Sequence, residues 1–517
     1  MKREEHLAKI NARKNPWDVL IIGGGASGLG AAVDAASRGY RTLLLEKYDF
    51  AKGTSSRSTK LVHGGVRYLQ NGDVSLVIEA LKERGIMRKN APHLVKDLSF
   101  VIPSYDWWNS PFYGIGLKIY DMMAGNLGLG PSTLLNRNET IELIPNVKKK
   151  GLRGGVIYHD GQFDDARMAI SLGQTADNHG ASLLNYFSVT GINKTNNMIS
   201  GVLAKDELSG KTYSIDAKVV INATGVFSDN VIQMDQPDAK KRIVPSQGVH
   251  IVLDKRFLSG PHAIMVPQTS DGRVLFAVPW NNYVVVGTTD TQMKEALIEP
   301  VALEEEIQFI LDNAGMYMTT PPTRADIKSV FSGLRPLAAP EDDGSATKEI
   351  SRHHKVIVST SGLVSILGGK WTTYRKMAED IVNTAQSVGG LPERSCITHS
   401  LPVHGYDYNS DWNNPLHVYG VDIDKITKQD PEGNTSLSEE LHLTKNQILW
   451  AVREEMAMTV EDVLARRTRA LFLNAAESLI LAPQVAVIMA KEMKKDSGWI
   501  SEQIENYTTL TKNYLLK

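Results

Sequence analysis

Three glycines near the start of the chain have the spacing of a turn that binds phosphate. Gly23, Gly25 and Gly28 form a G-x-G-x-x-G pattern directly after an apolar run at 19–22. In this pattern the first glycine permits a tight turn, the second lets the backbone approach a pyrophosphate, and the third lets a helix pack closely on the sheet. The N-terminus of that helix offers backbone N–H groups and the positive end of its dipole to the phosphates. The predicted chemistry is the binding of a dinucleotide.

The flanking residues supply the elements that this turn needs. Residues 19–22 are predicted to form a buried strand, the alanine-rich stretch at 26–38 a helix closed by Gly39, and residues 42–45 a second strand. Glu46 stands at the end of the second strand, about 20 residues past the glycines, where a carboxylate hydrogen-bonds the ribose of the adenosine. The same carboxylate would repel a 2′-phosphate, which disfavours NADP. The glycine pattern alone does not separate FAD from NAD.

Two further stretches carry groups suited to a cofactor. Residues 53–68 (GTSSRSTKLVHGGVRY) hold hydroxyls, cations and paired glycines, which indicates an extended loop whose backbone lies close to a bound group. Within 365–382 a glycine pair opens a predicted helix, so backbone N–H groups and Lys370 face a negative charge. A reduced flavin carries such a charge around N1 and C2=O, and a cation there would stabilise it.

The return of the chain to the first sheet favours FAD over NAD. Residues 218–225 (KVVINATG) predict a third buried strand long after the first glycines, whereas an NAD enzyme ordinarily completes its nucleotide domain in one block. This split layout resembles the FAD-dependent oxidoreductases of the glutathione-reductase superfamily. Strand patterns at 249–288, with turns at 271–272 and 281–282, predict an antiparallel sheet. The expected fold class is α/β: a split Rossmann-like FAD-binding domain, an antiparallel-sheet substrate domain and a C-terminal all-helical domain.

The same patterns give expected domain limits. We expect an FAD-dependent oxidoreductase region at 1–390 and a helical domain at 391–517, the latter with helical periodicity at 445–455, 460–467, 475–481 and 485–494. Within the first region, FAD-binding segments at about 16–75, 150–235 and 350–385 alternate with substrate-domain segments at about 76–149 and 236–349. The basic stretch ARRTRA at 465–470 is interpreted as a face for salt bridges between domains.

An aromatic-rich stretch at 104–129 is consistent with three arrangements. It fits a core helix, a cover over the active site, or a segment at a lipid interface. It is too short and too interrupted by polar residues to span a bilayer. The sequence leaves these alternatives open.

The bulk composition excludes several classes of protein. With 517 residues, of which 42% are hydrophobic, the chain is expected to form two or three domains. The formal net charge of −1 lacks the basic excess of nucleic-acid binders, and no metal-ligand spacing is present. The single cysteine, Cys396, excludes an internal disulfide and suits a reducing compartment. We expect a cytoplasmic protein, since the first fifteen residues lack the apolar core of a signal peptide, and contact with the inner face of the cytoplasmic membrane stays open.

Several motifs together resemble the FAD-dependent, aerobic-type (respiratory) glycerol-3-phosphate dehydrogenases. They are GTSSRSTKLVHGGVRYL at 53–69, KVVINATG at 218–225, QGVHIVL at 247–253, VGTTD at 286–290, SGLRPL at 332–337, GGKWTTYRK at 368–376 and EDVLARRTRALFL at 461–473. The resemblance covers nearly the whole chain, from 18 to about 481. It implies oxidation of the C2 alcohol of sn-glycerol 3-phosphate to dihydroxyacetone phosphate, transfer of the hydride to FAD, and passage of the electrons to a membrane quinone.

The resemblance also implies roles for individual residues. His250 is the candidate base for the C2 hydroxyl proton, with His63 as the alternative, and imidazole suits this task because it titrates near neutral pH. Arg335 is expected at the reacting centre and, with Arg67, on the substrate phosphate. Tyr68, Thr289 and Lys370 complete the expected substrate-binding set, together with His250. The residues expected to bind FAD are Gly23, Gly25, Ala26, Ser27, Gly28, Glu46, Lys47, Thr54, Ser55, Ser56, Ser58, Lys60, His63, Gly64, Gly65, Ala223, Thr224, Gly225, Gly333, Arg335, Gly369, Lys370, Trp371 and Thr372.

Three rival functions are considered. A glycerol-3-phosphate oxidase would use oxygen and release hydrogen peroxide, but such relatives carry a longer insertion than the roughly thirty residues between Leu337 and Gly368. An amine-oxidising FAD enzyme would not explain the C-terminal helical domain. A non-catalytic flavin-binding redox sensor would not need Arg67, His250, Arg335 and Lys370 together. The sequence leaves assembly as a homodimer open and predicts no nucleic-acid partner.

Overall fold

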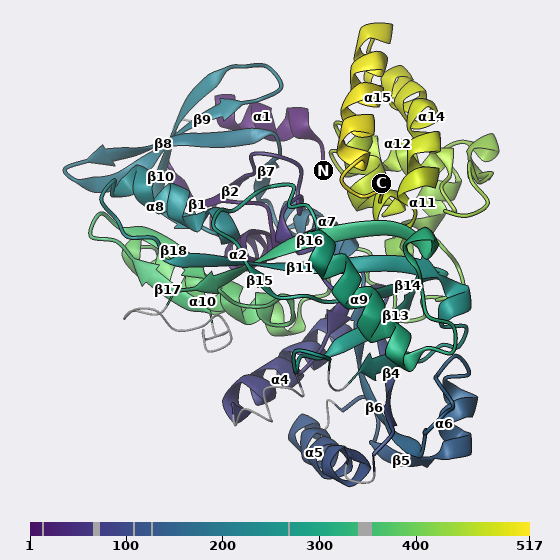
Figure 1. Cartoon of the computed structure of the whole chain (residues 1–517). Helices are drawn as coiled ribbons and strands as arrows, with labels where there is room; N and C mark the ends of the chain where they lie inside the picture. Colours follow the sequence, from purple (N-terminus) through teal and green to yellow (C-terminus); the bar gives the residue numbers. More distant parts are fainter. Residues whose placement is uncertain are drawn as a thin grey trace.

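A computed structural model describes residues 1–12, 15–65, 73–106, 109–125, 128–266, 269–339 and 354–516. Two of the expected substrate-binding residues, Arg67 and Tyr68, lie outside the described residues, as do Trp107 and Trp108 of the aromatic-rich stretch. Figure 1 shows two sheets and a separate group of C-terminal helices. In the part of the chain that the structure describes, no helix has the length and apolar character needed to cross a membrane.

The first sheet is built around the strand that precedes the glycine turn. Its strand order is β17 (Lys355–Val358), β18 (Leu363–Leu367), β10 (Thr212–Asn222), β1 (Trp17–Ile22), β2 (Thr42–Leu45) and β7 (Ser182–Leu184). β1 pairs in parallel with β2 on one side and with β10 on the other, which confirms the return of the chain to this sheet. β8 (Phe187–Thr195) and β9 (Met198–Asp206) extend β10 as an antiparallel meander. The parallel strands are continuous apolar runs because both faces of the sheet are covered.

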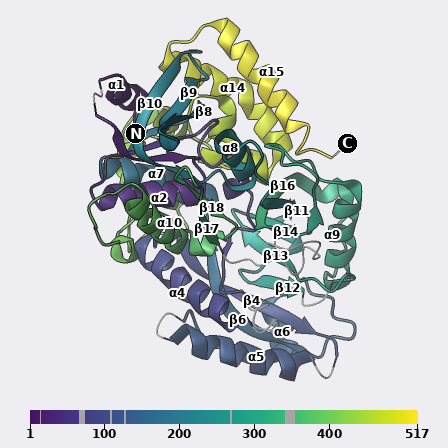
Figure 2. The ribbon, with the colours of Figure 1, turned by 90° about the vertical axis from the view of Figure 1, so that its left-hand side faces the viewer.

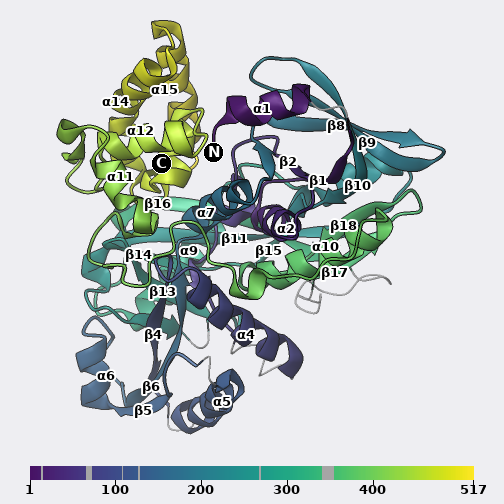
Figure 3. The same cartoon turned by 180° about the vertical axis from the view of Figure 1, so that it is seen from behind.

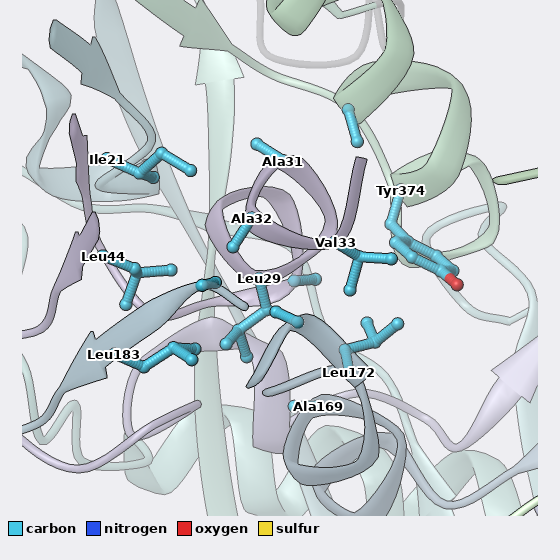
Figure 4. Packing of buried hydrophobic residues seen from close by; sticks show 14 of the residues in the cluster. Ile21, Leu29, Ala31, Ala32, Val33, Leu44, Ala169, Leu172, Leu183 and Tyr374 are labelled. Carbon is cyan, nitrogen blue, oxygen red and sulfur yellow. The ribbon is translucent and has the colours of Figure 1, made fainter. Parts of the chain in front are cut away.

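Three helices pack together on one face of this sheet. They are α2 (Ala26–Ser37), α7 (Asp165–Asn178) and α10 (Tyr374–Val388), which Figure 3 shows in front. Small residues of α2 allow the close approach, because a Cβ at Gly30 would lie 2.9 Å from the ring of Tyr374. Figure 4 shows Leu29 of α2 among Ile21, Leu44 and Leu183 of the strands and Leu172 of α7. The largest core cluster therefore lies directly beneath the glycine turn.

The second sheet is mainly antiparallel, as expected for the substrate domain. Its order is β15 (Thr291–Gln292), β11 (Ile243–Asp254), β14 (Tyr283–Gly287), β13 (Leu275–Trp280), β12 (Ala263–Val266), β4 (Val95–Ser104), β6 (Gly154–Phe163) and β3 (Leu61–Val62). β16 (Ile327–Ala338) pairs with the other edge of β11, and β5 (Thr133–Asn136) pairs with β6. The turn between β13 and β14 is made by Asn281 and Asn282, both with positive φ, as a two-residue hairpin requires.

One predicted boundary is wrong in detail. The segment from about 150 is predicted to belong to the FAD-binding part, but its first strand, β6, pairs with β4 over ten residues in the second sheet. After β6 the chain returns to the first sheet and its helices only with α7. The short strand β3, within the expected FAD-binding loop, also pairs with β6. The predicted boundary therefore lies about one strand too early, because an apolar run does not reveal which sheet it joins.

The remaining helices of the oxidoreductase region flank the two sheets. They are α1 (Arg3–Asn11), α4 (Val74–Asn90), α5 (Asn109–Ala124), α6 (Arg137–Leu143), α8 (Ser228–Asp235) and α9 (Glu304–Tyr317). α9 packs against β11, β13 and β14, as Figure 2 shows. α5, from the aromatic-rich stretch, buries Leu117 and Tyr120 against the rest of the protein. Its opposite face exposes Ile119 and Met122, so packing accounts for one face and lipid contact stays a prediction for the other.

The C-terminal region is helical, as predicted. Its main helices are α11 (Ile423–Thr427), α12 (Lys445–Glu454), the π-helical turn η10 (Asp462–Arg467), α13 (Ala470–Leu473), α14 (Ala475–Met493) and α15 (Ser497–Thr511). The two predicted helices at 475–481 and 485–494 are one helix, α14, which continues through Pro483. The sequence analysis did not predict α15, which packs on α14 (Figure 1).

Candidate functional site

A cavity of about 490 Å³ lies at the carboxyl ends of β1, β2 and β10. This is the edge of a parallel sheet at which α/β proteins bind their ligands. Its lining joins the glycine turn, the end of β2, the loop after it, the turn after β10, and the start of α10. The predicted cofactor residues among the lining are Gly23, Gly25, Ala26, Ser27, Glu46, Lys47, Thr54, Ser55, Ala223, Thr224, Gly225, Gly369, Lys370 and Trp371. The structure therefore brings residues from distant parts of the sequence to one cavity.

The glycine turn has the geometry that its spacing predicts. Gly23 has φ +109°, which favours glycine, and a Cβ at Gly28 would lie 1.9 Å from the carbonyl oxygen of Gly23. Gly28 therefore serves close packing rather than the cavity lining. Gly225 has φ +58° and open space where a side chain would stand. The backbone of both turns can approach a pyrophosphate, and the N-terminus of α2 points its N–H groups into the same region.

Glu46 lines the cavity and is bound to the glycine turn itself. Its Oε2 accepts a hydrogen bond from the backbone N–H of Gly24 at 2.6 Å, and its Oε1 accepts one from Tyr48 at 2.8 Å. Burial raises the pKa of this carboxyl group. The two N–H donors fix the carboxylate beside the turn, and its role towards a ribose stays a prediction.

The loop after β2 divides between the cavity and the core. Thr54 and Ser55, in the short helix η1 (Thr54–Ser56), line the cavity, whereas Ser56, Ser58 and Lys60 do not. The buried ammonium of Lys60 forms an ion pair with Asp165 at 2.7 Å, and the hydroxyl of Ser58 donates to the same carboxylate. Asp165 thus holds the polar side-chain groups of both Ser58 and Lys60, and their binding to the cofactor stays a prediction.

Gly64, the first of the paired glycines in this loop, packs closely against its neighbours. A Cβ at Gly64 would lie 2.5 Å from both Leu81 and the hydroxyl of Tyr120. The N–H of Gly64 donates to the Tyr120 hydroxyl at 2.8 Å, and that hydroxyl donates to Asp160 at 2.7 Å. Gly64 thus lies in close contact with α4 and α5, and its contact with the cofactor stays a prediction. Gly65 is not among the cavity-lining residues.

The backbone of His63 contacts the side chain of Thr372. The N–H of His63 lies 3.3 Å from the Thr372 hydroxyl oxygen, which joins the loop after β2 to the start of α10. Trp371, in η6 (Trp371–Thr373), donates its indole N–H to the carbonyl oxygen of Ser55 at 2.8 Å. Together these contacts close the side of the cavity between the two segments.

Arg335 lies beside the cavity on β16, opposite Ser246 of β11. Its guanidinium donates to the carbonyl oxygen of Thr289 at 3.1 Å and lies 3.5 Å from the carboxylate of Asp290. A Cβ at Gly248 would lie 2.5 Å from its Nη2, so the missing side chain at this position lets the guanidinium lie across β11. Gly248 and Asp290 lie in the motifs at 247–253 and 286–290, but neither is among the residues predicted for the site.

Gly333 does not line the cavity either. A Cβ there would lie 2.9 Å from the carbonyl oxygen of Arg57. Its role in the structure is therefore the close contact between β16 and the loop after β2.

His250 lies on the same face of the sheet, two residues after Gly248. Its ring stacks on Phe331 of β16 at 4.8 Å, and its Nε2 is 2.9 Å from the hydroxyl oxygen of Thr59. Gly287 of β14 permits this placement, because a Cβ there would lie 2.3 Å from the imidazole. Burial, together with nearby Lys60 and Arg335, lowers the pKa of His250 well below its ordinary value. The imidazole is therefore neutral at physiological pH and able to accept a proton.

The hydroxyl of Thr289 is bound within the protein on both sides. Its hydroxyl accepts from the N–H of Val249 at 3.0 Å and donates its one proton to Glu306 at 2.8 Å. Glu306, at the start of α9, also accepts from Gln247 at 2.7 Å. The buried Thr289 hydroxyl thus joins β11 to α9, and its predicted contact with the substrate stays a prediction.

Several cavity residues were missed by the sequence analysis. They include Lys52, Phe187, Val189, Asn230, Met234, Ala296, Leu297, Ile298, Pro336 and Met377. The aliphatic and aromatic ones carry no motif, since an apolar side chain in a cavity wall has the same pattern as one in the core. Lys52 directly precedes the predicted loop at 53–68, and this position is the signal by which the sequence could have placed it at the cavity.

The ARRTRA stretch joins the helical domain to the first sheet, as interpreted from the sequence. Both terminal nitrogens of Arg467 donate hydrogen bonds to the carboxylate of Asp49, at 2.7 and 2.9 Å, and Arg466 binds the same carboxylate. Arg469 pairs with Asp164 at 2.6 Å. These arginines are buried, and they serve the contact between domains rather than the cavity.

Comparison with protein families assigns both parts of the chain. Residues 18–375 match the family described as FAD dependent oxidoreductase. Residues 363–499 match the C-terminal domain of alpha-glycerophosphate oxidase.

Comparison with individual proteins gives matches over nearly the full chain. The mitochondrial glycerol-3-phosphate dehydrogenase of Homo sapiens is 38% identical, over 97% of this chain and 74% of its own length. That of Schizosaccharomyces pombe is 36% identical, over 99% of this chain and 89% of its own length. Among solved structures, the glycerol-3-phosphate dehydrogenase of Bacillus halodurans complexed with FAD superposes with a TM-score of 0.80 at 29% identity, covering 99% of this chain and 97% of that one.

Proposed function

Because the chain belongs to the FAD-dependent glycerol-3-phosphate dehydrogenase family, we propose that it oxidises sn-glycerol 3-phosphate to dihydroxyacetone phosphate and passes the electrons to a membrane quinone. The chain is an enzyme, and its cofactor is FAD. The observation that carries the proposed chemistry is the placement of His250 and Arg335 on one face of the β11–β16 pair.

The residues present fit FAD. The two glycine turns leave backbone exposed to a pyrophosphate, and the N-terminus of α2 adds N–H donors. Glu46 and Lys47 would hold the adenosine end, and Lys370 and Trp371 would lie at the other segment of the cavity wall. FAD, when bound, supplies the acceptor for the hydride that leaves C2 of the substrate.

The proton of the C2 hydroxyl is assigned to His250. His250 is neutral at neutral pH, the form in which an imidazole can accept a proton, and its lowered pKa makes it a weaker base than free imidazole. Its contact with Thr59 and its stacking on Phe331 fix the ring in one orientation. Such fixed placement is what a general base needs in order to act on one hydroxyl.

The substrate phosphate is assigned to Arg335, together with Arg67 and Tyr68. A guanidinium binds phosphate through two parallel N–H donors, and it stays charged at all working pH values. The carbonyl oxygen of Thr289 and the carboxylate of Asp290 orient the guanidinium of Arg335. We propose that Lys370 adds a third cation for the phosphate, or a cation for a reduced flavin.

The acceptor is proposed to be a quinone. The family model that matches 363–499 is named for an oxidase, so oxygen is the alternative acceptor. The family resemblance implies a longer insertion at this place in oxidases, so the roughly thirty residues between Leu337 and Gly368 favour the dehydrogenase. A quinone acceptor would place the enzyme at the cytoplasmic membrane, with the exposed Ile119 and Met122 of α5 as the proposed contact.

The assignment of both residues is tested by anaerobic flavin reduction. Arg335→Ala should raise the substrate concentration for half-maximal reduction by about 10- to 100-fold, because hydrogen bonds to charged groups contribute about 1.5–3 kcal/mol, while FAD content is unchanged. His250→Gln should slow the limiting reduction rate by about 10²-fold or more with little change in that concentration. Unchanged half-saturation in Arg335→Ala, or an unchanged limiting rate in His250→Gln, would remove that residue from its role.

A further inference from the structure

One carboxylate, Glu299, lies where three parts of the molecule meet beside the cofactor cavity. It directly follows Ala296, Leu297 and Ile298, which line the cavity from the substrate-domain side. Those three residues bring no charged side chain to the cavity wall. The contacts that hold Glu299 in place therefore also hold the adjacent cavity wall at 296–298 in place.

Glu299 is held by a cation and a hydroxyl. Its Oε2 lies 2.7 Å from the guanidinium of Arg57, and the hydroxyl of Tyr514 donates to the same oxygen at 3.0 Å. Arg57 belongs to the loop after β2, and its own guanidinium also donates to the carbonyl oxygen of Ser332 on β16 at 3.1 Å. The carboxylate thus joins the cavity wall to the FAD-binding loop and to the C-terminal helical domain.

Tyr514 is itself firmly placed. It is buried, its ring packs edge-to-face on Phe472 at 5.6 Å, and its carbonyl oxygen accepts from the N–H of Val330 on β16 at 2.9 Å. Phe472 in turn packs on Phe331, the ring that stacks on His250. The hydroxyl of Tyr514 is therefore presented to Glu299 from a rigid part of the protein.

A second link follows the same path. Lys52 lines the cavity, pairs with Glu461 of the helical domain at 2.7 Å, and lies 3.9 Å from Glu299. Burial alone would raise the pKa of Glu461, but Arg466 and Lys52 lower it to about 2, so this carboxylate is charged at neutral pH. Two cations from the loop after β2 thus each pair with a carboxylate of a neighbouring domain, Arg57 with Glu299 and Lys52 with Glu461.

We propose that the hydrogen bond from Tyr514 to Glu299 is a latch by which the C-terminal helical domain holds the 296–298 wall over the bound FAD. Tyr514 and Glu299 are positioning residues in this proposal: neither lines the cavity, and both act through the wall and through Arg57. The helical domain then has a function in retaining the cofactor beyond packing. The inference rests on FAD binding alone and is independent of the acceptor and of the base.

Tyr514→Phe tests the latch, because it removes only the hydroxyl. The FAD dissociation rate, measured by the rise of free-flavin fluorescence after dilution of the holoenzyme, should increase about tenfold. Amide hydrogen exchange of a peptide covering 294–300 should become faster in the same variant. Glu299→Ala should reproduce both changes, because it removes the carboxylate that the hydroxyl holds.

Tyr507→Phe is the matched control. Tyr507 is also a buried tyrosine of the helical domain, and its hydroxyl donates to Ser478 at 2.9 Å within that domain. This variant loses a comparable hydrogen bond but should release FAD at the wild-type rate. The proposal is overturned if Tyr514→Phe releases FAD within twofold of the wild-type rate, or if Tyr507→Phe releases it as fast as Tyr514→Phe.

Discussion

Asp49→Asn should weaken the joint between the helical domain and the first sheet. Asp49 is fully buried and binds both Arg466 and Arg467, with the amide of Asn185 as a further donor at 3.3 Å. Burial alone would raise the pKa of Asp49, but the two arginines lower it to about 2. The carboxylate is therefore charged at neutral pH, and its removal leaves two buried guanidinium groups without their shared partner.

The size of the effect follows from that loss. Removing one partner of a buried ion pair costs about 3–5 kcal/mol. Arg466 keeps Glu461 and Asp462, so the lower end of this range, about 3 kcal/mol, is expected. With an unfolding entropy of about 2.1 cal/mol/K per residue over 517 residues, this corresponds to a fall in Tm of about 3 °C. Calorimetry of the holoenzyme measures the fall in Tm, and unfolding in guanidinium measures the loss of unfolding free energy.

Asp424→Asn provides the control for this experiment. Asp424 pairs with Lys428 at 3.1 Å, but both side chains are more than three-quarters exposed. Such a pair contributes less than about 0.5 kcal/mol, so this variant should unfold like the wild type. If Asp49→Asn is no more destabilising than Asp424→Asn, the buried network does not hold the domains together and the reasoning fails.

Two further predictions concern the glycine turn and the dependence of stability on pH. Gly28→Ala places a methyl group 1.9 Å from the carbonyl oxygen of Gly23, so the purified variant should hold less than about a tenth of the wild-type FAD by flavin absorbance; full flavin content would contradict this account of the turn. Burial, with Arg167 nearby, lowers the pKa of His93 to about 3 in the folded protein, from an ordinary value of 6.5. Below pH 6.5 the unfolded chain therefore binds a proton at His93 that the folded protein does not bind, and this favours unfolding. This stability is present above that value and is lost as the pH falls, by about 2 kcal/mol between pH 7 and pH 5. His93→Leu should lose about this much of the pH dependence of the unfolding free energy, and an unchanged slope would exclude His93 as its source.

Local patterns predicted the elements whose causes lie within a few residues. The glycine turn needs only its own spacing, and the β13–β14 hairpin follows from two strands joined by Asn281 and Asn282. The ARRTRA stretch could be interpreted correctly because buried arginines need carboxylate partners. Their actual partner, Asp49, could not be named, since it lies more than 400 residues away in the sequence.

The contacts that local patterns did not predict come from residues distant in the sequence. Lys60 was expected at the cofactor because of its loop, but Asp165, distant in the sequence, takes its ammonium. Thr289 was expected at the substrate because of its motif, but Glu306 takes its proton. In both cases a tertiary hydrogen bond decides between two polar environments that the sequence cannot distinguish. The binding of the substrate by Arg67 and Tyr68 stays a prediction, because both residues lie outside the described part of the chain.

The central claim is tested most directly by mixing the holoenzyme with sn-glycerol 3-phosphate without oxygen while the flavin absorbance is followed, and then adding either a soluble quinone or oxygen. The proposed function predicts rapid bleaching of the flavin, rapid reoxidation by the quinone and slow reoxidation by oxygen. Rapid reoxidation by oxygen with formation of hydrogen peroxide would contradict the acceptor and indicate an oxidase. No bleaching at all would contradict the substrate while leaving the FAD-binding fold in place.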